Sequence, residues 1–551
     1  MEESELLARC AEREDFDWAL ALLFDLLAID TSPRANLGSL REAESRAFAV
    51  LERAATEILG RSGSVRRVPV TPEIQHHPAY TPPFYTARGV GDEPLPASEA
   101  YEGRTNLVVR MPGGGRGVLA FNSHVDTVAP YLPIRAEGDV VFGRGACDAK
   151  GQCVAMLGAL RLLGRVRRHA GSITPCDLVF QFVIDEEAGG NGSLSLALDP
   201  RLGFDAMVVL EPTCLRIHPG NRGAVWYRLV CDTCDLPGGN PIALALEVTL
   251  ALEEAGAALK AESDHPLFPH RPVQTCHGML GPWGEHPSAV NDRVELFIRP
   301  SRRREEVIEA IERGVAAFCR RYGDKTIEPP EGSSRLERHY ELRDEADGAR
   351  LVVHGIAGHM GAAERCDNAI VKAAYIVREL EACGGIERLA FEPGAEPTAV
   401  ALEGGQGFLP THSIEEVEER MRRATSEAVS RYCRRRGAVG REGLAMMTFE
   451  KLHNEAFARD PQGRAAVALV EAARAVGIEV EEPLRGWDVS CDARLFATEH
   501  PSSEVLTFGA GSLEHAHSPQ EQVSFGEVAS AAKAIAAFAL AYEPQGRRED
   551  G

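Results

Sequence analysis

Residues able to bind a metal follow four short apolar runs in this chain of 551 residues. The runs are Gly117–Asn122, Leu178–Ile184, Ala206–Leu210 and Glu504–Phe508. The residues that follow them are, in order, His124 with Asp126, the triplet Asp185-Glu186-Glu187, Glu211, and His515 with His517. Short apolar runs of this kind are typical of buried strands. Because the carboxyl ends of parallel strands meet at one edge of a sheet, the pattern predicts a metal-dependent α/β enzyme.

His124 and Asp126 stand two residues apart, so in an extended strand their side chains point the same way. The carboxylate of Asp126 can then orient the imidazole of His124. A histidine at a strand end can also be a hydrogen-bonded polar residue with no metal. Asp148 follows in Gly143-Arg-Gly-Ala-Cys-Asp-Ala-Lys-Gly151, at the start of an apolar segment with helical composition. It can cap that helix, or it can bridge two cations.

Three acids stand together at Asp185, Glu186 and Glu187. Adjacent carboxylates at the end of a buried strand repel one another unless cations or protons neutralise them. A solvated turn is the alternative, but the apolar run before the acids and the glycines after them favour a metal site. Of two neighbouring carboxylates, one can bind a metal while the other takes a proton from water.

Composition sets the broad class of the protein. With 44% apolar residues, the chain can bury large cores and is expected to form two or three domains. The amino terminus is acidic and no run of about 18 apolar residues occurs, so we expect a cytoplasmic protein. The thirteen cysteines follow no disulfide pattern. The formal charge of −22 argues against nucleic acid and against an anionic membrane as partners.

Together these segments resemble the di-zinc exopeptidase and deacylase family, which includes aminoacylase, acetylornithine deacetylase, succinyl-diaminopimelate desuccinylase, glutamate carboxypeptidase and the carnosinase-like dipeptidases. The resemblance rests on Ser-His124-Val-Asp126-Thr-Val, Gly-Arg-Gly-Ala-Cys-Asp148-Ala-Lys-Gly, Asp-Glu186-Glu187, Glu211-Pro-Thr and Ala-His517-Ser-Pro-Gln-Glu, in the family's order. It covers essentially the whole chain. It implies an α/β catalytic domain with a mostly parallel sheet and helices on both faces, plus an inserted α+β lid.

The resemblance also implies a cofactor of two Zn²⁺ ions, for which Co²⁺ or Mn²⁺ can substitute. One ion would be held by His124, Asp148 and Glu211. The other would be held by Asp148, Glu187 and His517, so that Asp148 bridges the two. His515 competes with His517 for the last position, and the Ala-His-Ser-Pro context favours His517.

Two further roles follow from the same resemblance. Glu186 would be the general base, and Asp126 would orient His124. In family members the peptide after the bridging aspartate is often cis, which predicts a cis bond between Asp148 and Ala149.

A repeat in the middle of the chain predicts a doubled lid. The segment from Glu305-Glu-Val to Gly323 recurs from Glu415-Glu-Val to Gly437. We expect the catalytic domain at residues 1–222 and 439–551. We expect the lid at residues 223–438, as two ferredoxin-like copies at about 223–330 and 331–438.

The doubled lid resembles that of the family's monomeric dipeptidases, in which it imitates a dimer. The family's lid histidine matches His359 in Gly355-Ile-Ala-Gly-His-Met-Gly, whereas residues 224–240 contain no histidine. We therefore expect a monomer in which His359 polarises the scissile carbonyl in cis. A buried or solvated histidine is the alternative. Asn291 and Arg299 match lid residues near the substrate, although Arg299 can equally form a surface salt bridge.

The function predicted from these residues is hydrolysis of an amide bond in a dipeptide or small peptide by a water that two metals activate. An N-acyl-amino-acid deacylase would use the same catalytic residues and is the alternative. A non-catalytic metal-binding regulator is a third possibility, against which the presence of Glu186 argues.

Overall fold

The four apolar runs form neighbouring parallel strands of one six-stranded sheet in the computed structural model. They are, in spatial order, β6 (Asp177–Val183), β3 (Val118–His124), β7 (Ala206–Val209) and β21 (Glu504–Thr507). At the β6 edge, β2 (Thr105–Met111) and then β1 (Ser64–Pro69) continue the sheet in antiparallel pairs. The predicted α/β fold with a mostly parallel sheet is confirmed.

The register of the strands brings the residues after them to one edge of the sheet. His124 lies opposite Val183, so that the three acids follow directly beside it. Val209 pairs with Asn122 on one side and with Thr507 on the other. Glu211 and the loop after β21 therefore begin at the same edge as His124.

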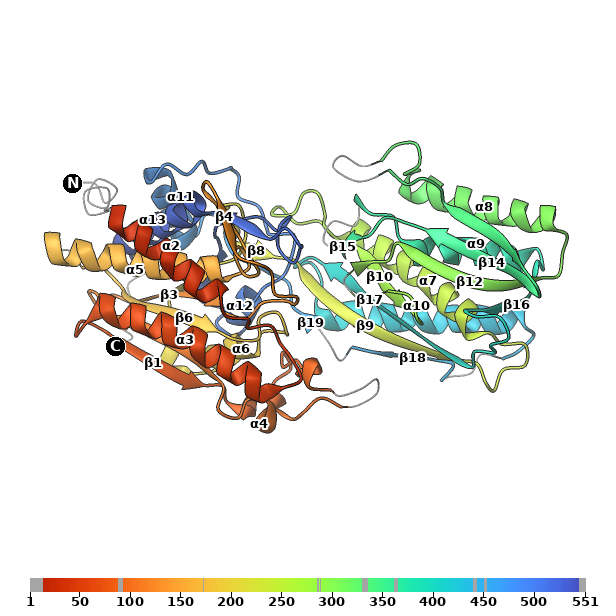
Figure 1. Ribbon diagram of the computed structural model, residues 1–551, viewed down its shortest axis with the longest axis horizontal. Helices are drawn as coiled ribbons and strands as arrows, with labels where there is room; N and C mark the ends of the chain where they lie inside the picture. The colour runs from red at the N-terminus through yellow and green to blue at the C-terminus, as the bar shows by residue number, and fades with distance from the viewer. Residues whose placement is uncertain are drawn as a thin grey trace. The chain divides into compact units, whose positions relative to one another are not determined.

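Helices cover both faces of this sheet because its strands are apolar on both sides. Leu119 and Phe121 of β3 face one core and Ala120 faces the other. The first face is covered by α2 (Arg13–Leu27), α3 (Leu37–Leu59), α5 (Lys150–Ala170), α11 (Arg464–Ala475) and α13 (Phe525–Ala541), of which α2, α3 and α5 lie side by side (Figure 1). The second face is covered by α6 (Asn191–Ala197) and α12 (Ala493–Glu499).

Shorter elements complete this part of the chain. A three-stranded sheet has the order β22-β5-β4 (Gln522–Ser524, Val140–Phe142 and Arg135–Glu137). The segment between β1 and β2 contains η1 (Pro72–His76), η2 (Phe84–Thr86) and α4 (Ala97–Ala100).

The structure describes residues 13–87, 93–171, 173–284, 287, 289–329, 335–360, 365–439, 443–449 and 453–544. The chain divides into two compact units. The first unit comprises residues 1–222 and 454–551 and holds the six-stranded sheet, and the second comprises residues 223–453. The second unit continues beyond residue 438 because β18 (Ala445–Thr448) pairs with β9 (Gly223–Asp232).

The second unit contains two antiparallel sheets. One has the order β10-β17-β9-β18, with β10 at Thr275–Leu280 and β17 at Ala399–Phe408, and α7 (Pro241–Glu262) and α10 (Ile414–Arg435) pack on it. The other has the order β13-β14-β12-β16, at Tyr340–Glu345, Gly348–His354, Arg293–Pro300 and Ile386–Ala390. On it packs α9 (Ala369–Ala382), with α8 (Arg304–Tyr322) against α9 (Figure 1).

The repeated segments of the sequence occupy matching positions in this unit. If the unit is divided at the β13–β14 hairpin and the two-residue strands β11 (Ala289–Val290) and β15 (Gly358–His359) are set aside, each half runs strand-helix-strand-strand-helix-strand. The repeat beginning at Glu305 is α8 and the repeat beginning at Glu415 is α10, the second helix of each half. Asn240 and Asn368 cap α7 and α9, the first helix of each half.

The two halves do not fold as separate copies. The sheet β10-β17-β9-β18 takes two strands from each half, and so does the sheet β13-β14-β12-β16. Each sheet nevertheless has the strand-helix-strand-strand-helix-strand order of one copy, because the segment from β12 to β16 is inserted between β10 and β17. The two sheets therefore do not follow the expected division of the lid near residue 330.

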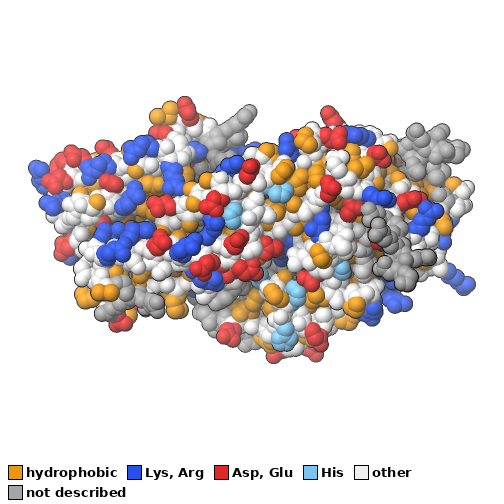
Figure 2. Space-filling view, turned by 180° about the vertical axis from the view of Figure 1, so that it is seen from behind, with side chains coloured by type: hydrophobic (Ala, Val, Ile, Leu, Met, Phe, Trp, Pro, Cys, Tyr) orange, Lys and Arg blue, Asp and Glu red, His pale blue; other side chains and the backbone are white. Residues whose placement is uncertain are grey.

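Charged side chains of both signs lie at the surface. Figure 2 shows acidic and basic side chains interspersed over the face in view. Exposed ion pairs such as Arg303–Glu306 contribute about 0–1 kcal/mol each, so stability depends mainly on the buried cores. Among the described residues, no helix is both long and apolar enough to cross a membrane.

Candidate metal centre

Asp148 lies between two histidines at the carboxyl edge of the parallel sheet. His124 is the last residue of β3, Asp148 lies just before α5, and His517 lies in the loop after β21. Asp148 Oδ1 is 3.1 Å from His124 Nε2, and Asp148 Oδ2 is 3.2 Å from His517 Nε2. The two carboxylate oxygens thus face different histidines, which is the arrangement that a bridging ligand requires. The Asp148–Ala149 peptide is cis, as predicted.

The glutamates after β6 and β7 surround this pair of contacts. Both carboxylate oxygens of Glu187 lie 3.1 Å from His517 Nε2. Glu211 Oε2 and Glu186 Oε2 lie 4.0 and 3.9 Å from His124 Nε2. Possible ligand atoms of His124, Glu186 and Glu211 lie within 4.8 Å of one another, as do those of His124, Asp148 and Glu187. The structure therefore brings the five expected ligands together and places Glu186 among them.

The two candidate histidines after β21 have different surroundings. His517 faces Asp148 and Glu187. His515 lies 3.2 Å from the side-chain nitrogen of Gln522 instead. Of the two, the geometry favours His517.

Asp126 holds both His124 and the backbone of the acidic triplet. The backbone carbonyl of Asp126 is 3.0 Å from His124 Nδ1, and its carboxylate Oδ1 is 3.5 Å from the same atom. The carboxylate also accepts hydrogen bonds from the amides of Glu186 and Glu187, at 3.3 and 3.0 Å. Asp126 therefore orients an imidazole and two neighbouring glutamates at once.

A buried network behind the triplet was missed from the sequence. Asp185 has a positive φ of 62° and accepts hydrogen bonds from Arg104 and from the hydroxyl groups of Tyr85 and Tyr101. Arg104 is fully buried and also pairs with Glu44. The two tyrosines lie in the segment between β1 and β2, and they fix the carboxylate that precedes Glu186. In the sequence, the only sign of this network is the proline and tyrosine content of the segment, which does not specify the hydrogen-bond partners.

Glu521 was also missed, although it closes the motif that contains His517. Its carboxylate accepts hydrogen bonds from the amides of Gly145 and Asp148, at 2.9 and 3.2 Å, and pairs with buried Arg144 at 2.6 Å. Glu521 thus holds the backbone that presents Asp148.

Replacing Glu521 with alanine is expected to weaken metal binding about 10–100-fold, because the peptide of Asp148 loses its support. Competition with a chromophoric chelator measures this affinity. Gln520→Ala, at the exposed neighbouring position, is the control, and far-ultraviolet circular dichroism checks that the variant folds. Unchanged affinity in a folded Glu521→Ala protein would contradict a positioning role.

The electrostatics of the centre favour bound cations. Burial raises the pKa of Glu186, Glu187, Glu211 and Asp492, and neighbouring carboxylates add to this effect. Burial acts on Asp148 in the same direction, but hydrogen bonds with His124 and His517 outweigh it and lower its pKa. Glu187 and then Asp148 raise the pKa of His517 to about 12. So many carboxylates in one buried site require positive charge.

The residues present fit a divalent-cation centre. In the described part of the chain, Glu211 Oε1 and Asp492 Oδ2 are buried without a hydrogen-bond partner. Unpaired buried carboxylate oxygens are costly unless a cation binds them. The candidate ligands are imidazole nitrogens and carboxylate oxygens, which suit Zn²⁺, Co²⁺ and Mn²⁺.

The three residues predicted in the lid belong to the second unit. His359 lies in β15 (Gly358–His359), whose partner is β11 (Ala289–Val290). Asn291 is buried and accepts a hydrogen bond from the amide of Arg293 at 2.9 Å. Arg299 forms an ion pair with Asp347 at 3.3 Å. This contact is the surface salt bridge of the alternative interpretation.

Solved structures resemble this chain over nearly its whole length. Human carnosine dipeptidase 1 has a TM-score of 0.53 at 15% identity and covers 98% of this chain and 99% of its own. A metallo-carboxypeptidase of family M20 from Sulfolobus solfataricus has a TM-score of 0.52 at 14% identity, covering 95% of this chain and 98% of its own. At these identities the likeness shows the fold alone.

Sequence comparison finds a relative that matches only part of this chain and a family profile that matches most of it. A peptidase M20 domain-containing protein of Schizosaccharomyces pombe is 34% identical over 120 residues, which are 22% of this chain and 29% of that protein. This chain thus aligns with about a third of the length of that relative. The profile of the family described as peptidase family M20/M25/M40 matches residues 120–541, a span that includes every residue of the candidate centre. The chain therefore belongs to peptidase family M20/M25/M40.

Proposed function

We propose that this protein is a hydrolase that cleaves an amide bond of a dipeptide or small peptide with the help of two divalent cations. The observation that carries the proposal is the position of Asp148, whose two carboxylate oxygens each face a different histidine. A single carboxylate placed in this way suits two cations that share one ligand. Family membership and the dipeptidase and carboxypeptidase among the structural neighbours support the same reaction class.

In this proposal, the metal ligands fall into two sets that share Asp148. His124 and Glu211 complete one set, and Glu187 and His517 complete the other. Zn²⁺ is the cation that we propose for both, with Co²⁺ and Mn²⁺ as substitutes. When bound, such cations act as Lewis acids and make a water molecule more acidic.

The chain's own residues would carry the proton and hold the geometry. Glu186 takes a proton from the attacking water and passes it to the leaving amine, which is general base and then general acid catalysis by one carboxylate. Asp126 keeps the imidazole of His124 and the backbone of Glu186 in place through the contacts described above. Asp185, fixed by Arg104, holds the start of the same turn.

A substrate panel tests the proposal. Apo-protein loaded with Zn²⁺ or Co²⁺ is assayed against dipeptides and against N-acyl amino acids, because a deacylase would use the same residues. Turnover of dipeptides supports a peptidase, and turnover of N-acyl amino acids alone would replace it with a deacylase. Two bound metals with no turnover of either class would contradict the proposal and favour a non-catalytic metal-binding protein.

We further propose that His359 contributes to turnover within the same chain. His359→Ala is expected to lower kcat about 10²–10³-fold, the usual cost of losing one oxyanion donor, while metal content stays unchanged. His270→Ala, exposed in the same unit, is the control.

Mixing His359→Ala protein with an inactive Glu186 variant distinguishes a monomer from a dimer that shares its sites. A monomer gives no activity in the mixture. Restored activity would show that the histidine is supplied by another copy, and would contradict the expected monomer.

A further inference from the structure

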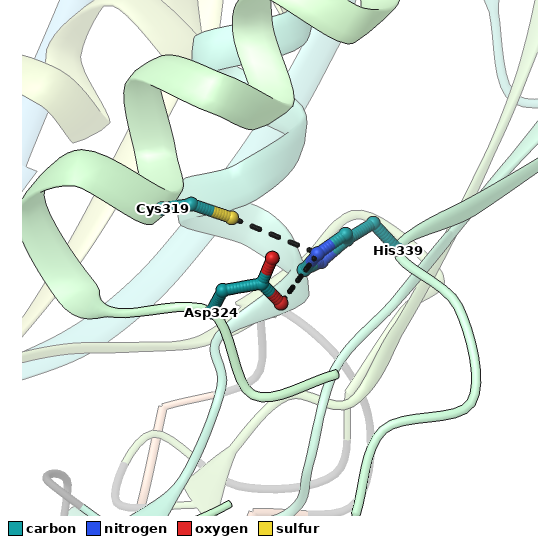
Figure 3. A group of neighbouring side chains, drawn as sticks. All are labelled: Cys319, Asp324 and His339. Carbon is teal, nitrogen blue, oxygen red and sulfur yellow. Dashed lines mark hydrogen bonds and ion pairs between the residues drawn. The ribbon is translucent and has the colours of Figure 1, made fainter. Parts of the chain in front are cut away.

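Three side chains that can bind a metal converge in the second unit, in a group unrelated to the centre of the first unit. Cys319 belongs to the last turn of α8, Asp324 follows that helix, and His339 immediately precedes β13. Figure 3 shows the three side chains pointing toward one another from these segments. Their possible ligand atoms all lie within 4.8 Å of one another.

The contacts in this group meet at a single nitrogen atom. His339 Nε2 is 3.6 Å from Cys319 Sγ and 3.1 Å from Asp324 Oδ1 (Figure 3). In a catalytic cysteine relay, the thiol and the carboxylate would contact opposite nitrogens of the imidazole. Here both face Nε2, while Nδ1 is buried without a hydrogen-bond partner among the described residues. The geometry therefore does not fit a cysteine nucleophile.

The same distances fit three ligands of a tetrahedral cation. With ordinary Zn–S, Zn–N and Zn–O bond lengths, tetrahedral geometry places sulfur and nitrogen about 3.6 Å apart and nitrogen and oxygen about 3.4 Å apart. The observed separations are 3.6 and 3.1 Å. Two of the three separations are thus close to those of zinc ligands, and the third, between the sulfur and a carboxylate oxygen, is within 4.8 Å.

The surroundings suit a cation with one open position. The three residues line a surface pocket of about 580 Å³, together with Glu312 and Tyr340. Asp324 is held in place because its Oδ1 accepts hydrogen bonds from the amide and hydroxyl groups of Thr326, at 2.9 and 2.6 Å. The pocket leaves room for water as a fourth ligand, as in zinc sites with three protein ligands.

The positive charge nearest the group is paired. Burial, and then the charge of Lys372, lower the pKa of His339, and Lys372 itself pairs with Asp367 at 2.6 Å. Burial raises the pKa of Cys319.

We propose that Cys319, Asp324 and His339 form a further binding site for a zinc-type divalent cation, separate from the centre proposed for catalysis. A cation bound there links the end of α8 to the residue that precedes β13. Cysteine, histidine and aspartate together favour Zn²⁺ over Mg²⁺ or Ca²⁺. The proposal does not depend on the proposed function, because it concerns other residues and a sulfur ligand.

Cobalt spectroscopy of the full-length protein tests the site. Apo-protein is titrated with Co²⁺, and near-ultraviolet absorption is followed, where thiolate-to-cobalt charge transfer occurs. The ligands proposed for the catalytic centre are nitrogens and oxygens, so this band reports a cysteine ligand only. We expect the wild-type protein to show the band and to bind one equivalent of Co²⁺ more than the Cys319→Ser variant, which should lose the band.

Two variants complete the experiment. His339→Gln should weaken the band, and it provides a second test if Cys319→Ser fails to fold. Cys383→Ser should keep the band, since Cys383 is a half-buried free cysteine of the same unit that faces the carbonyl of Leu380. A wild-type protein without the band, or a band that persists in folded Cys319→Ser protein, would overturn the proposal. Hydrolytic activity has no part in the readout, so failure here is distinguishable from failure of the proposed function.

Discussion

Glu186→Gln protein is expected to lose peptide hydrolysis by about 10²–10⁴-fold in kcat while its metal content stays that of the wild type. Glutamine has nearly the same size as glutamate and fills the same space, but it cannot take a proton from water. The assay compares kcat on the best dipeptide of the panel for the wild-type and variant enzymes, each with its metal content measured. Glu471→Gln, at an exposed position of α11, is the control and should behave as the wild type.

The metal content of this variant also decides between two roles for Glu186. Its carboxylate lies 3.9 Å from His124 Nε2 and close enough to Glu211 to share a cation with them. If Glu186→Gln protein loses a metal together with its activity, Glu186 is a ligand and the proposed general base is wrong. Retained metal with lost turnover supports the role of base.

Asp148→Asn protein is expected to bind at most one metal in the centre of the first unit and to be inactive. The asparagine side chain offers one oxygen in place of two and carries no charge, so it cannot neutralise two cations. Metal analysis after dialysis against low free Zn²⁺ measures the change. Asp199→Asn is a matched control, because Asp199 pairs with Arg201 at the surface away from the centre.

Thermal unfolding gives a second readout for Asp148. A cation that binds only the folded state stabilises it by about 2.7 kcal/mol when its free concentration is 100 times its dissociation constant. A chelator should therefore lower the Tm of the wild-type protein more than that of the Asp148→Asn variant, with both compared in the Cys319→Ser background. Two tightly bound metals in the Asp148→Asn protein of that background would show that Asp148 does not bridge them.

Much of the candidate centre could be predicted from the sequence because it depends on short-range features. Apolar runs that end in His124, Glu187 and Glu211 predict parallel strands, and parallel strands bring their carboxyl ends together. The cis peptide after Asp148 and the choice of His517 over His515 were implied by the resemblance of their local motifs to the family. Pattern and spacing sufficed for the strands, because these are local features of the chain.

The residues that hold the candidate centre in place could not be predicted from local patterns. Arg104 meets Asp185, and Glu521 meets Asp148, across large separations in sequence. Nothing in the spacing of these residues indicates their partners, because the contacts arise only when the sheet and its loops pack together. The burial that raises the pKa of the glutamates is a product of the same packing.

In the second unit, too, the sequence determined some features and the tertiary structure decided others. The sequence by itself determined the repeat, since the segments beginning at Glu305 and Glu415 recur as local patterns. Only the tertiary structure decided that each sheet takes strands from both halves and that Cys319, Asp324 and His339 meet. Strand pairing joins residues far apart in the chain, and a pairing between halves satisfies the same backbone hydrogen bonds as a pairing within one half, so the residue pattern favours neither.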